Sequence, residues 1–169
     1  MNGSERAAGE VVEPVDSDVD LHGPEQRREQ RRDGLSVLAV IAAGGALGAS
    51  ARYGVALALP HGPNDWPWST LLINVMGCLL IGVLMVLVLE VWVAHRLVRP
   101  FLGVGILGGY TTFSTYAVEA QQLIAAGRAG LALAYMVATV IAAVVAVQVG
   151  IIGTRMVAFR RAKERGGER

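Results

Sequence analysis

Cysteine and histidine are scarce in this chain, and their positions exclude several kinds of site. The one cysteine, Cys78, lies in an apolar run, so neither a disulfide framework nor a cysteine metal cluster is available. The three histidines, His22, His61 and His95, are scattered over tail and loops. The sequence contains no Ser/His/Asp set, metal-ligand cluster or phosphate-binding loop, so an enzyme is the least favoured class of function.

Charge is also scarce where it would matter most. Charged residues make up 17% of the chain and are confined mainly to the ends and loops, whereas 53% of the residues are hydrophobic and the mean hydropathy is +0.47. Long uncharged runs of this kind are typical of an integral membrane protein and not of a soluble one. The formal net charge of +1 therefore says little about partners, and we expect membrane lipid but no nucleic acid among them.

Four apolar segments are long enough to cross a hydrocarbon core of about 30 Å as helices. They run roughly from Leu35 to Leu59, from Ser69 to Val93, from Pro100 past Glu119, and from Leu131 to Val157. The expected fold class is an all-α integral membrane protein with four transmembrane helices, the third of them broken in mid-membrane. Glycines at 44, 45, 48, 77 and 82 are expected to let neighbouring helices approach closely.

The predicted domain organisation is a membrane domain flanked by two tails. Residues 1–33 mix charged residues, Gly and Pro and predict a disordered cytoplasmic tail. Residues 34–158 form the four-helix domain, and residues 159–169 form a basic cytoplasmic tail. Arg128 is the one basic residue in a loop on the far side, and by the positive-inside rule both termini are cytoplasmic. The basic residues on the near side are Arg27, Arg28, Arg31, Arg32, Arg96, Arg99, Arg155, Arg160, Arg161, Lys163, Arg165 and Arg169.

The third segment holds the stretch on which the functional interpretation depends, GVGILGGYTTFSTYAVE from Gly103 to Glu119. Gly108 and Gly109 weaken the helix, because glycine loses the most backbone entropy on folding. Four hydroxyl residues follow between positions 111 and 115. A helix broken at membrane depth persists only where it is buried in protein or lines a polar cavity, and transport proteins build ion sites there. The alternative is an ordinary packing helix whose hydroxyls bond to their own backbone.

A few polar residues lie in the other segments. Arg52 in the first helix either extends to the interface or attracts anions at a vestibule. Asn74 in the second is either a hydrogen bond between helices or an anion ligand. Glu119 is either a helix-cap partner or a vestibule charge. Tyr135 and Thr139, four residues apart, share a face of the fourth helix.

Three motifs closely resemble the small fluoride channel family (Fluc, also called CrcB). They are GGALGASARY at 44–53, STLLINVMG at 69–77 and GILGGYTTFSTYAVE at 105–119, and their order and spacing span all but the tails. The third motif is the specific one. The resemblance implies an antiparallel dimer with two fluoride pores at its interface and a structural sodium ion, not transported, on the central axis.

The resemblance also implies roles for individual residues. Backbone carbonyls of Gly108 and Thr111 would be sodium ligands, with the partner subunit supplying the equivalent pair, and Arg52 would be a vestibule residue. The residues implied for the anion pathway are Asn74, Phe113, Ser114, Thr115, Tyr116, Tyr135 and Thr139. The family usually has Phe where this chain has Tyr116, so its hydroxyl is expected either to donate to fluoride or to obstruct movement of the ring.

The function expected is passive export of fluoride through the plasma membrane, which lowers cytoplasmic fluoride. Because the basic residues favour one side so strongly, we hypothesise a fixed orientation and an oppositely oriented, related partner subunit. A homodimer inserted both ways is the alternative. Two other functions compete with a channel: a non-conducting subunit of a heterodimer, and a small proton-coupled multidrug exporter. The exporter needs a carboxylate within the membrane, whereas Glu90 and Glu119 lie near helix ends.

Overall fold

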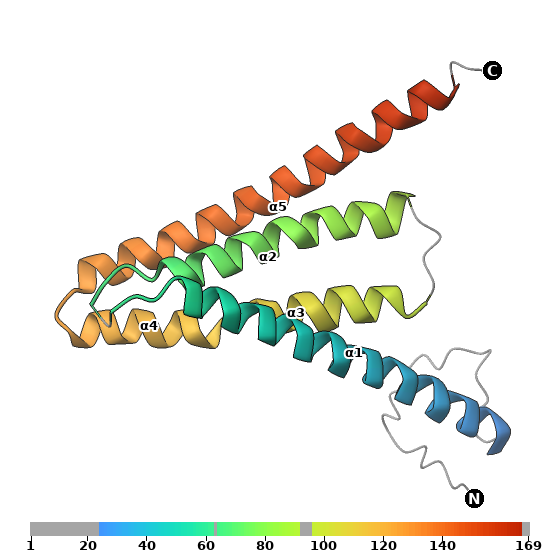
Figure 1. Ribbon diagram of the computed structural model, residues 1–169, viewed down its shortest axis with the longest axis horizontal. Coiled ribbons are helices and arrows are strands. Elements are labelled where there is room, and N and C mark those ends of the chain that lie inside the picture. Colours follow the sequence, from blue (N-terminus) through green and yellow to red (C-terminus); the bar gives the residue numbers. More distant parts are fainter. Residues whose placement is uncertain (1–23, 63, 92–95, 167–169) are drawn as a thin grey trace, which may run out of the picture. The chain divides into compact units, whose positions relative to one another are not determined.

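The computed structural model describes residues 24–62, 64–91 and 96–166. The chain forms two compact units, residues 1–35 and residues 36–169. All secondary structure in the described residues is helical, which confirms the predicted all-α class. The elements are α1 (Pro24–Ala58), α2 (Trp68–Val86), the π-helical turn η1 (Leu87–Val91), the π-helical segment η2 (Pro100–Leu107), α3 (Gly108–Tyr110), α4 (Ser114–Ala125) and α5 (Ala129–Gly166) (Figure 1).

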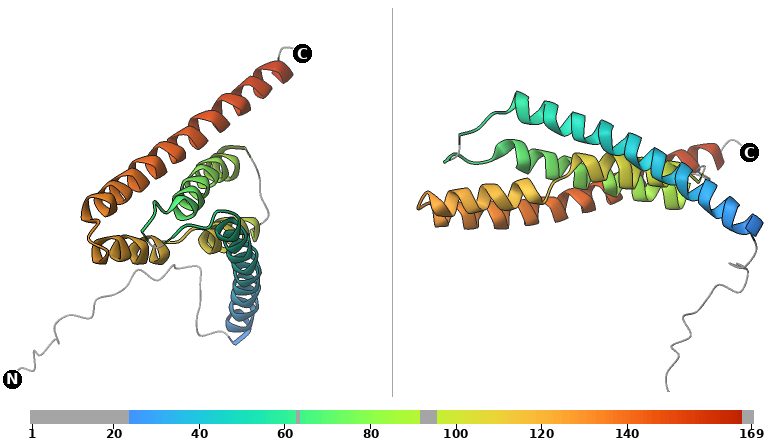
Figure 2. Two further views of the ribbon diagram at one scale, coloured as in Figure 1. Left: turned by 60° about the vertical axis from the view of Figure 1, so that its left-hand side comes forward. Right: turned by 90° about the horizontal axis from the view of Figure 1, so that it is seen from below.

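Three unbroken helical stretches are long and apolar enough to cross a membrane, namely Gly34–Ala58, Trp68–Glu90 and Ala129–Arg160. The remaining crossing is divided among η2, α3 and α4, with an interruption between α3 and α4 that Figure 2 shows from two sides. A broken third helix is therefore confirmed, and so is a membrane protein built only of helices. The end of α1 and the start of α2 lie near the α4–α5 turn, whereas the end of η1 and the start of η2 lie toward the opposite end (Figure 1).

The predicted tail boundaries differ from the helix ends. Helix α1 begins at Pro24, ten residues inside the stretch assigned to the N-terminal tail, and α5 continues to Gly166. Glu, Gln and Arg make up most of the first extension, and Arg, Lys, Glu and Ala make up most of the second. These residues have high helix propensity, so each membrane helix continues beyond its apolar part. The prediction of disorder for residues 1–23 lies outside the described residues.

Glycines bring α2 and α5 close together, and Figure 1 shows the two helices side by side in the half that holds the start of α5. A Cβ on Gly82 would lie 2.5 Å from the Val147 carbonyl oxygen, and one on Gly150 would collide with the Leu79 carbonyl. Real side chains do not approach backbone this closely, so only glycine permits this helix separation. The predicted close packing at Gly82 is confirmed.

A second glycine contact joins α1 to the third crossing. A Cβ on Gly44 would lie 2.5 Å from the Phe101 carbonyl oxygen, and one on Gly48 would collide with the carbonyl of Ile106. From the other side, a Cβ on Gly109 would collide with the carbonyl of Gly45. The small residues predicted to allow close approach thus do so at Gly44 and Gly48, and α1 packs directly on η2 and α3.

The twin glycines are not where the helix breaks, which corrects the sequence interpretation. Gly108 has helical dihedrals (φ −64°, ψ −37°), and the helix continues through Tyr110 before Thr111 turns to extended backbone (φ −78°, ψ 158°). The interruption is therefore at residues 111–113. Gly109 serves the contact with α1 described above, so its small size, and not its weak helix propensity, explains its place.

Candidate functional site

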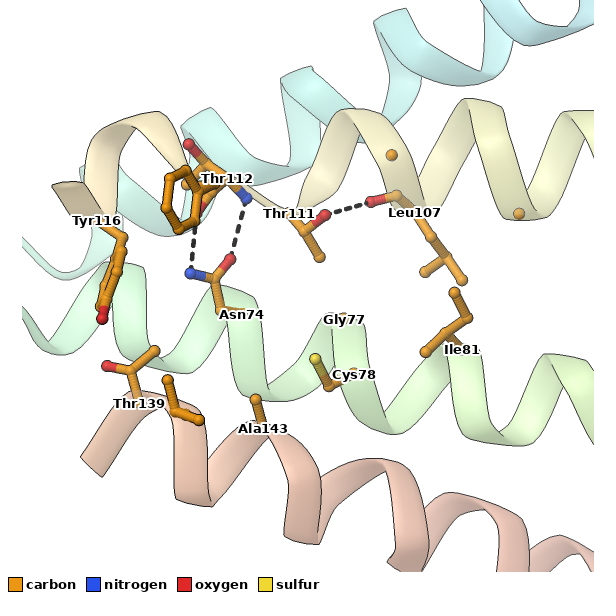
Figure 3. A pocket seen from close by; sticks show the side chains of 14 residues that line it. Asn74, Gly77, Cys78, Ile81, Leu107, Thr111, Thr112, Tyr116, Thr139 and Ala143 are labelled. Carbon is orange, nitrogen blue, oxygen red and sulfur yellow. Dashed lines mark hydrogen bonds between the residues drawn. The ribbon is translucent and has the colours of Figure 1, made fainter. Parts of the chain in front are cut away.

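One side chain of α2, Asn74, stabilises the interruption between α3 and α4 by hydrogen bonds. Asn74 Nδ2 donates to the Thr112 carbonyl at 3.0 Å, and Asn74 Oδ1 accepts from the Thr112 amide at 3.0 Å (Figure 3). The side-chain amide therefore replaces both main-chain partners that Thr112 gives up by leaving the helix, as a buried peptide group requires. Asn74 thus makes hydrogen bonds from α2 to the third crossing, which is one of the two roles predicted for it.

The break releases carbonyl groups that an unbroken helix would use. The Thr112 amide, which would bond to the Gly108 carbonyl four residues earlier, is bonded to Asn74 instead. The Thr111 carbonyl lies at the extended residue and accepts a hydrogen bond from Arg52 Nη1 at 3.3 Å. Arg52 therefore reaches from α1 to the break, where its guanidinium satisfies one lone pair of a freed carbonyl.

Hydroxyl groups restart the helix after the break. The Thr112 hydroxyl oxygen accepts from the Thr115 amide at 3.1 Å, and this hydroxyl donates to Thr115 Oγ1 at 3.0 Å. It also lies 3.3 Å from Ser114 Oγ. A Thr side chain bonded to the amide three residues later is the usual way to satisfy the first free N–H groups of a helix. The hydroxyls of Ser114 and Thr115 are thus engaged with the start of α4.

A pocket of about 440 Å³ lies beside the break, between α2, the third crossing and α5 (Figure 3). Asn74, Tyr116 and Thr139 lie toward one end of it, and Leu107 and Ile81 lie toward the other (Figure 3). The lining is mostly apolar, with a few amide and hydroxyl groups. The residues that line it are Asn74, Gly77, Cys78, Ile81, Gly103, Leu107, Gly108, Thr111, Thr112, Phe113, Tyr116, Thr139, Val140 and Ala143.

Three aromatic rings form a row beside this pocket. Phe113 and Tyr116 have ring centroids 5.7 Å apart, and Tyr116 and Tyr135 have centroids 5.3 Å apart. Phe113 is 79% exposed in the single chain, whereas Tyr135 is fully buried. The Tyr116 hydroxyl donates to the Met136 carbonyl of α5 at 3.3 Å, so this ring is tied to a backbone group. The row leads from the exposed edge of the pocket into the core between α4 and α5.

Glu119 ends this row, and its burial was not predicted. The carboxylate is 8% exposed and accepts from the Thr70 hydroxyl at 2.7 Å (Oε1) and from the Tyr135 hydroxyl at 2.9 Å (Oε2). The sequence spacing could have indicated this burial, because residues 116 and 119 are one turn apart and share a helix face. A carboxylate on the same buried face as an aromatic pathway residue needs hydrogen-bond donors from neighbouring helices.

The structure brings most of the predicted pathway residues together. Asn74, Phe113, Tyr116 and Thr139 all line the pocket. Ser114 and Thr115 do not, since they lie at the start of α4, and Tyr135 lies deeper, between the pocket and Glu119. Gly108 and Thr111, the predicted sodium ligands, line the pocket as well.

The chemistry of the freed carbonyls suits a hard cation such as sodium. Among the described residues there is no group of three or more His, Cys, Asp or Glu side chains that could hold a metal ion, so such a site would depend on backbone oxygen. Gly108 offers a carbonyl without its usual amide partner, and the Thr111 carbonyl keeps a second lone pair beside its bond from Arg52. Two carbonyls are fewer than the oxygen ligands that hard cations usually take, so further oxygen atoms would have to complete the set.

Comparison with known protein families matches residues 39–151 to the family described as "CrcB-like protein, Camphor Resistance (CrcB)". The chain is 50% identical over 121 residues to the "Fluoride-specific ion channel FluC 2" of Streptomyces avermitilis, which is 72% of this chain and 77% of that protein. It is 54% identical over 111 residues to the "Fluoride-specific ion channel FluC 1" of Streptomyces coelicolor, covering 66% of this chain and 72% of the relative.

A third relative comes from the same organism as the first. The "Fluoride-specific ion channel FluC 3" of Streptomyces avermitilis is 40% identical over 127 residues, covering 75% of this chain and 62% of that protein. Streptomyces avermitilis therefore has at least two related proteins with this name.

Proposed function

The chain belongs to the CrcB family, and from this premise we propose that it is a fluoride-selective channel that lets fluoride leave the cytoplasm down its electrochemical gradient. The observation that supports this best is the pocket beside the broken third crossing, where Asn74, Phe113, Tyr116 and Thr139 meet. Relatives that are half identical to the chain are named fluoride-specific ion channels. A channel of this kind needs no catalytic set.

The lining suits a small, strongly hydrated anion. Leaving water, fluoride needs closely spaced donors, and conduction requires that none of them binds too tightly. Aromatic edges carry partial positive charge from the ring quadrupole, so Phe113 and Tyr116, with centroids 5.7 Å apart, offer adjacent weak contacts. The Thr139 hydroxyl lines the same pocket. It donates its hydrogen to the Tyr135 carbonyl at 2.8 Å, and this bond within α5 fixes the direction of the Thr139 oxygen.

A second subunit would complete the pathway, and we propose an antiparallel dimer. Phe113 lies at the pocket and is 79% exposed in the single chain. Gly108 is exposed beside it, and a Cβ there would meet nothing within 4 Å. An aromatic ring and a glycine of one pocket, both uncovered, are what an interface with a partner helix requires. The partner would add the second wall and a second pair of carbonyls.

Gly108 and Thr111 would hold a structural sodium ion through their carbonyls at that interface. When bound, the ion would supply positive charge between the two pathways and satisfy oxygen atoms that the break has freed. Arg52 supports the same region from α1 through its bond to the Thr111 carbonyl. If this is right, replacing sodium by a large organic cation lowers the thermal stability of the assembled protein but not that of a separated subunit.

The location that fits this function is the plasma membrane, with both termini in the cytoplasm. Arg96, Arg99, Arg155 and Arg160 lie toward the end of the helices that holds the η1–η2 connection, and Arg128 lies in the turn at the other end. The excess of basic residues marks the cytoplasmic side. A proton-coupled exporter is less well supported, because Glu90 is paired with Arg155 (Nη2–Oε1 2.5 Å) and Glu119 is bonded to two hydroxyls.

The test is fluoride efflux from liposomes, measured with a fluoride electrode, for the unmodified chain and for Phe113→Ile, each reconstituted together with a related chain of opposite orientation. Since Phe113 is largely exposed, its replacement should leave the fold of the subunit intact while removing an aromatic edge from the pathway. We expect efflux to fall about a hundredfold, as for loss of a preorganised electrostatic contact of ~3 kcal/mol. The matched control is Phe159→Ile on α5, where the ring is 70% exposed and lies outside the pocket.

Efflux of fluoride but not chloride by the unmodified protein, lost in Phe113→Ile and kept in Phe159→Ile, supports the proposal. Equal loss in both variants would point to a general defect of insertion. Absence of efflux in the unmodified protein, alone and mixed with a related chain of opposite orientation, would favour a non-conducting role.

A further inference from the structure

His61, in the connection between α1 and α2, lies directly over the buried carboxylate of Glu119. Its Nε2 is 3.3 Å from Glu119 Oε1, and its Nδ1 is 3.2 Å from the Ser69 hydroxyl oxygen. The His61 side chain is 22% exposed and that of Glu119 is 10% exposed. His61 is therefore the more accessible member of the pair.

The hydrogen bonds around His61 fit both of its charge states. A neutral ring that donates from Nε2 to the carboxylate accepts at Nδ1, and the Ser69 hydroxyl then donates. A protonated ring donates from both nitrogens, and the same hydroxyl rotates to accept. Ser69 is 3% exposed, so it is held in place for either arrangement. Gaining a proton thus changes the charge of the pair without breaking a contact.

The charge of this pair bears on the proposed anion pathway through Tyr135. The Tyr135 hydroxyl donates to Glu119 Oε2 at 2.9 Å, and the Tyr135 ring lies against the ring of Tyr116 in the pocket, with centroids 5.3 Å apart and planes tilted by 48°. With neutral His61 the pair carries one negative charge, which opposes an approaching anion. With protonated His61 the pair is neutral, and that opposition is removed.

We propose that His61 is a positioning residue for Glu119 and makes fluoride conduction depend on pH, with faster conduction at acid pH. The inference rests on the proposed channel function. Histidine is the side chain whose charge changes between about pH 5 and pH 8, so the dependence falls in the physiological range. A unit charge a few Å from the pathway is expected to change the rate about tenfold.

Other charged groups near the pair are few and already engaged. Asp65 shares a small cavity with His61 and Glu119, and its Oδ2 accepts from the Gly62 amide at 3.1 Å. Arg128 donates to the Asn64 carbonyl of the same connection. Both side chains are exposed to solvent. Tyr135, a further titratable neighbour among the described residues, acts as the hydroxyl donor already described.

The experiment measures fluoride efflux from liposomes that contain this chain and a related chain of opposite orientation, with about pH 5.5 or about pH 8 on both sides, where histidine is mostly charged or mostly neutral. Protein-free liposomes correct for leakage of the neutral acid. The unmodified chain should conduct about tenfold faster at the lower pH. In His61→Gln, which keeps a neutral donor, the rates should be equal at both pH values and close to the slow rate. Asp65→Asn is the matched control and should keep the pH dependence.

A second measurement does not depend on conduction. In the purified chain, the histidine NMR signals that disappear in His61→Gln belong to the His61 ring, and in Glu119→Gln these signals should move because the carboxylate 3.3 Å from the ring is gone. Signals that move in Glu119→Gln without any efflux would contradict the channel function and leave the contact between the two residues standing. Efflux whose pH dependence survives in His61→Gln, or His61 signals unchanged in Glu119→Gln, would overturn the inference. A His61→Gln rate reduced equally at both pH values would show a purely structural role.

Discussion

Tyr116 shows how a single hydroxyl can alter an otherwise aromatic pathway. The structure directs this hydroxyl to the Met136 carbonyl at 3.3 Å, on the backbone of α5. Of the two effects expected from the sequence, this geometry favours restraint of the ring over donation to the anion. The ring is held between Phe113 and Tyr135 as well, so it has neighbours on both sides.

Replacing Tyr116 by Phe should therefore remove the hydrogen bond that restrains the ring, while an aromatic ring still fills the same position. We expect fluoride efflux to rise about threefold, while the stability of the subunit falls by no more than about 1 kcal/mol for one long neutral hydrogen bond. Efflux from liposomes and thermal unfolding in detergent measure the two effects. A lower rate in Tyr116→Phe would mean that the hydroxyl itself serves the ion, and Tyr53→Phe on the exposed surface of α1 provides the control.

At the scale of the elements, close helix contacts explain several of the glycines, among them Gly44, Gly48, Gly82, Gly109 and Gly150. Gly48 and Gly54 lie on the same helix, α1, but in different surroundings. A Cβ on Gly48 would collide with the Ile106 carbonyl, whereas one on Gly54 would meet nothing within 4 Å. The two positions therefore separate the effect of packing from that of helix propensity.

Gly48→Ala should destabilise the subunit by about 2 kcal/mol, because α1 would have to move away from the third crossing. Gly54→Ala should be neutral or stabilise it by up to ~1 kcal/mol, since alanine favours the helix. Thermal unfolding of the two variants, purified side by side, measures the difference. Equal melting temperatures would contradict the close contact between α1 and η2.

The sequence was sufficient to predict the number and helical nature of the membrane segments, but not the position of the break in the third segment. Runs of apolar residues and the hydroxyl-rich stretch predicted four helices with an interrupted third one, because bilayer thickness and helix rise leave little choice. The break lies at Thr111–Phe113 and not at Gly108 and Gly109, because its position depends on Asn74, a partner on another helix. The burial of Glu119 escaped prediction for the same reason, since its donors come from α2 and α5.

At the scale of the whole molecule, the question is which chain covers the exposed side of the pocket. The pocket, Phe113 and Gly108 are open in a single subunit, and the proposed sodium site holds only half of its ligands. An antiparallel partner must insert with the opposite orientation. A homodimer achieves this only if the same chain inserts both ways, which requires nearly balanced charge at the two ends.

The charge distribution of this chain is far from balanced, so we expect one orientation and a related partner of opposite orientation. Arg155 strengthens the bias, because its guanidinium is fixed by Glu90 at the end of the helices assigned to the cytoplasm. Expressed alone, the chain should place a C-terminal reporter only in the cytoplasm. Liposomes that contain the chain alone should show no fluoride efflux, and adding a related chain of opposite charge bias should restore efflux. Streptomyces avermitilis has two such relatives, named FluC 2 and FluC 3, and a pair of related subunits requires two chains of this kind in one organism. Efflux from liposomes that contain this chain alone would contradict an obligatory heterodimer, since a subunit with one orientation cannot pair with itself in antiparallel fashion.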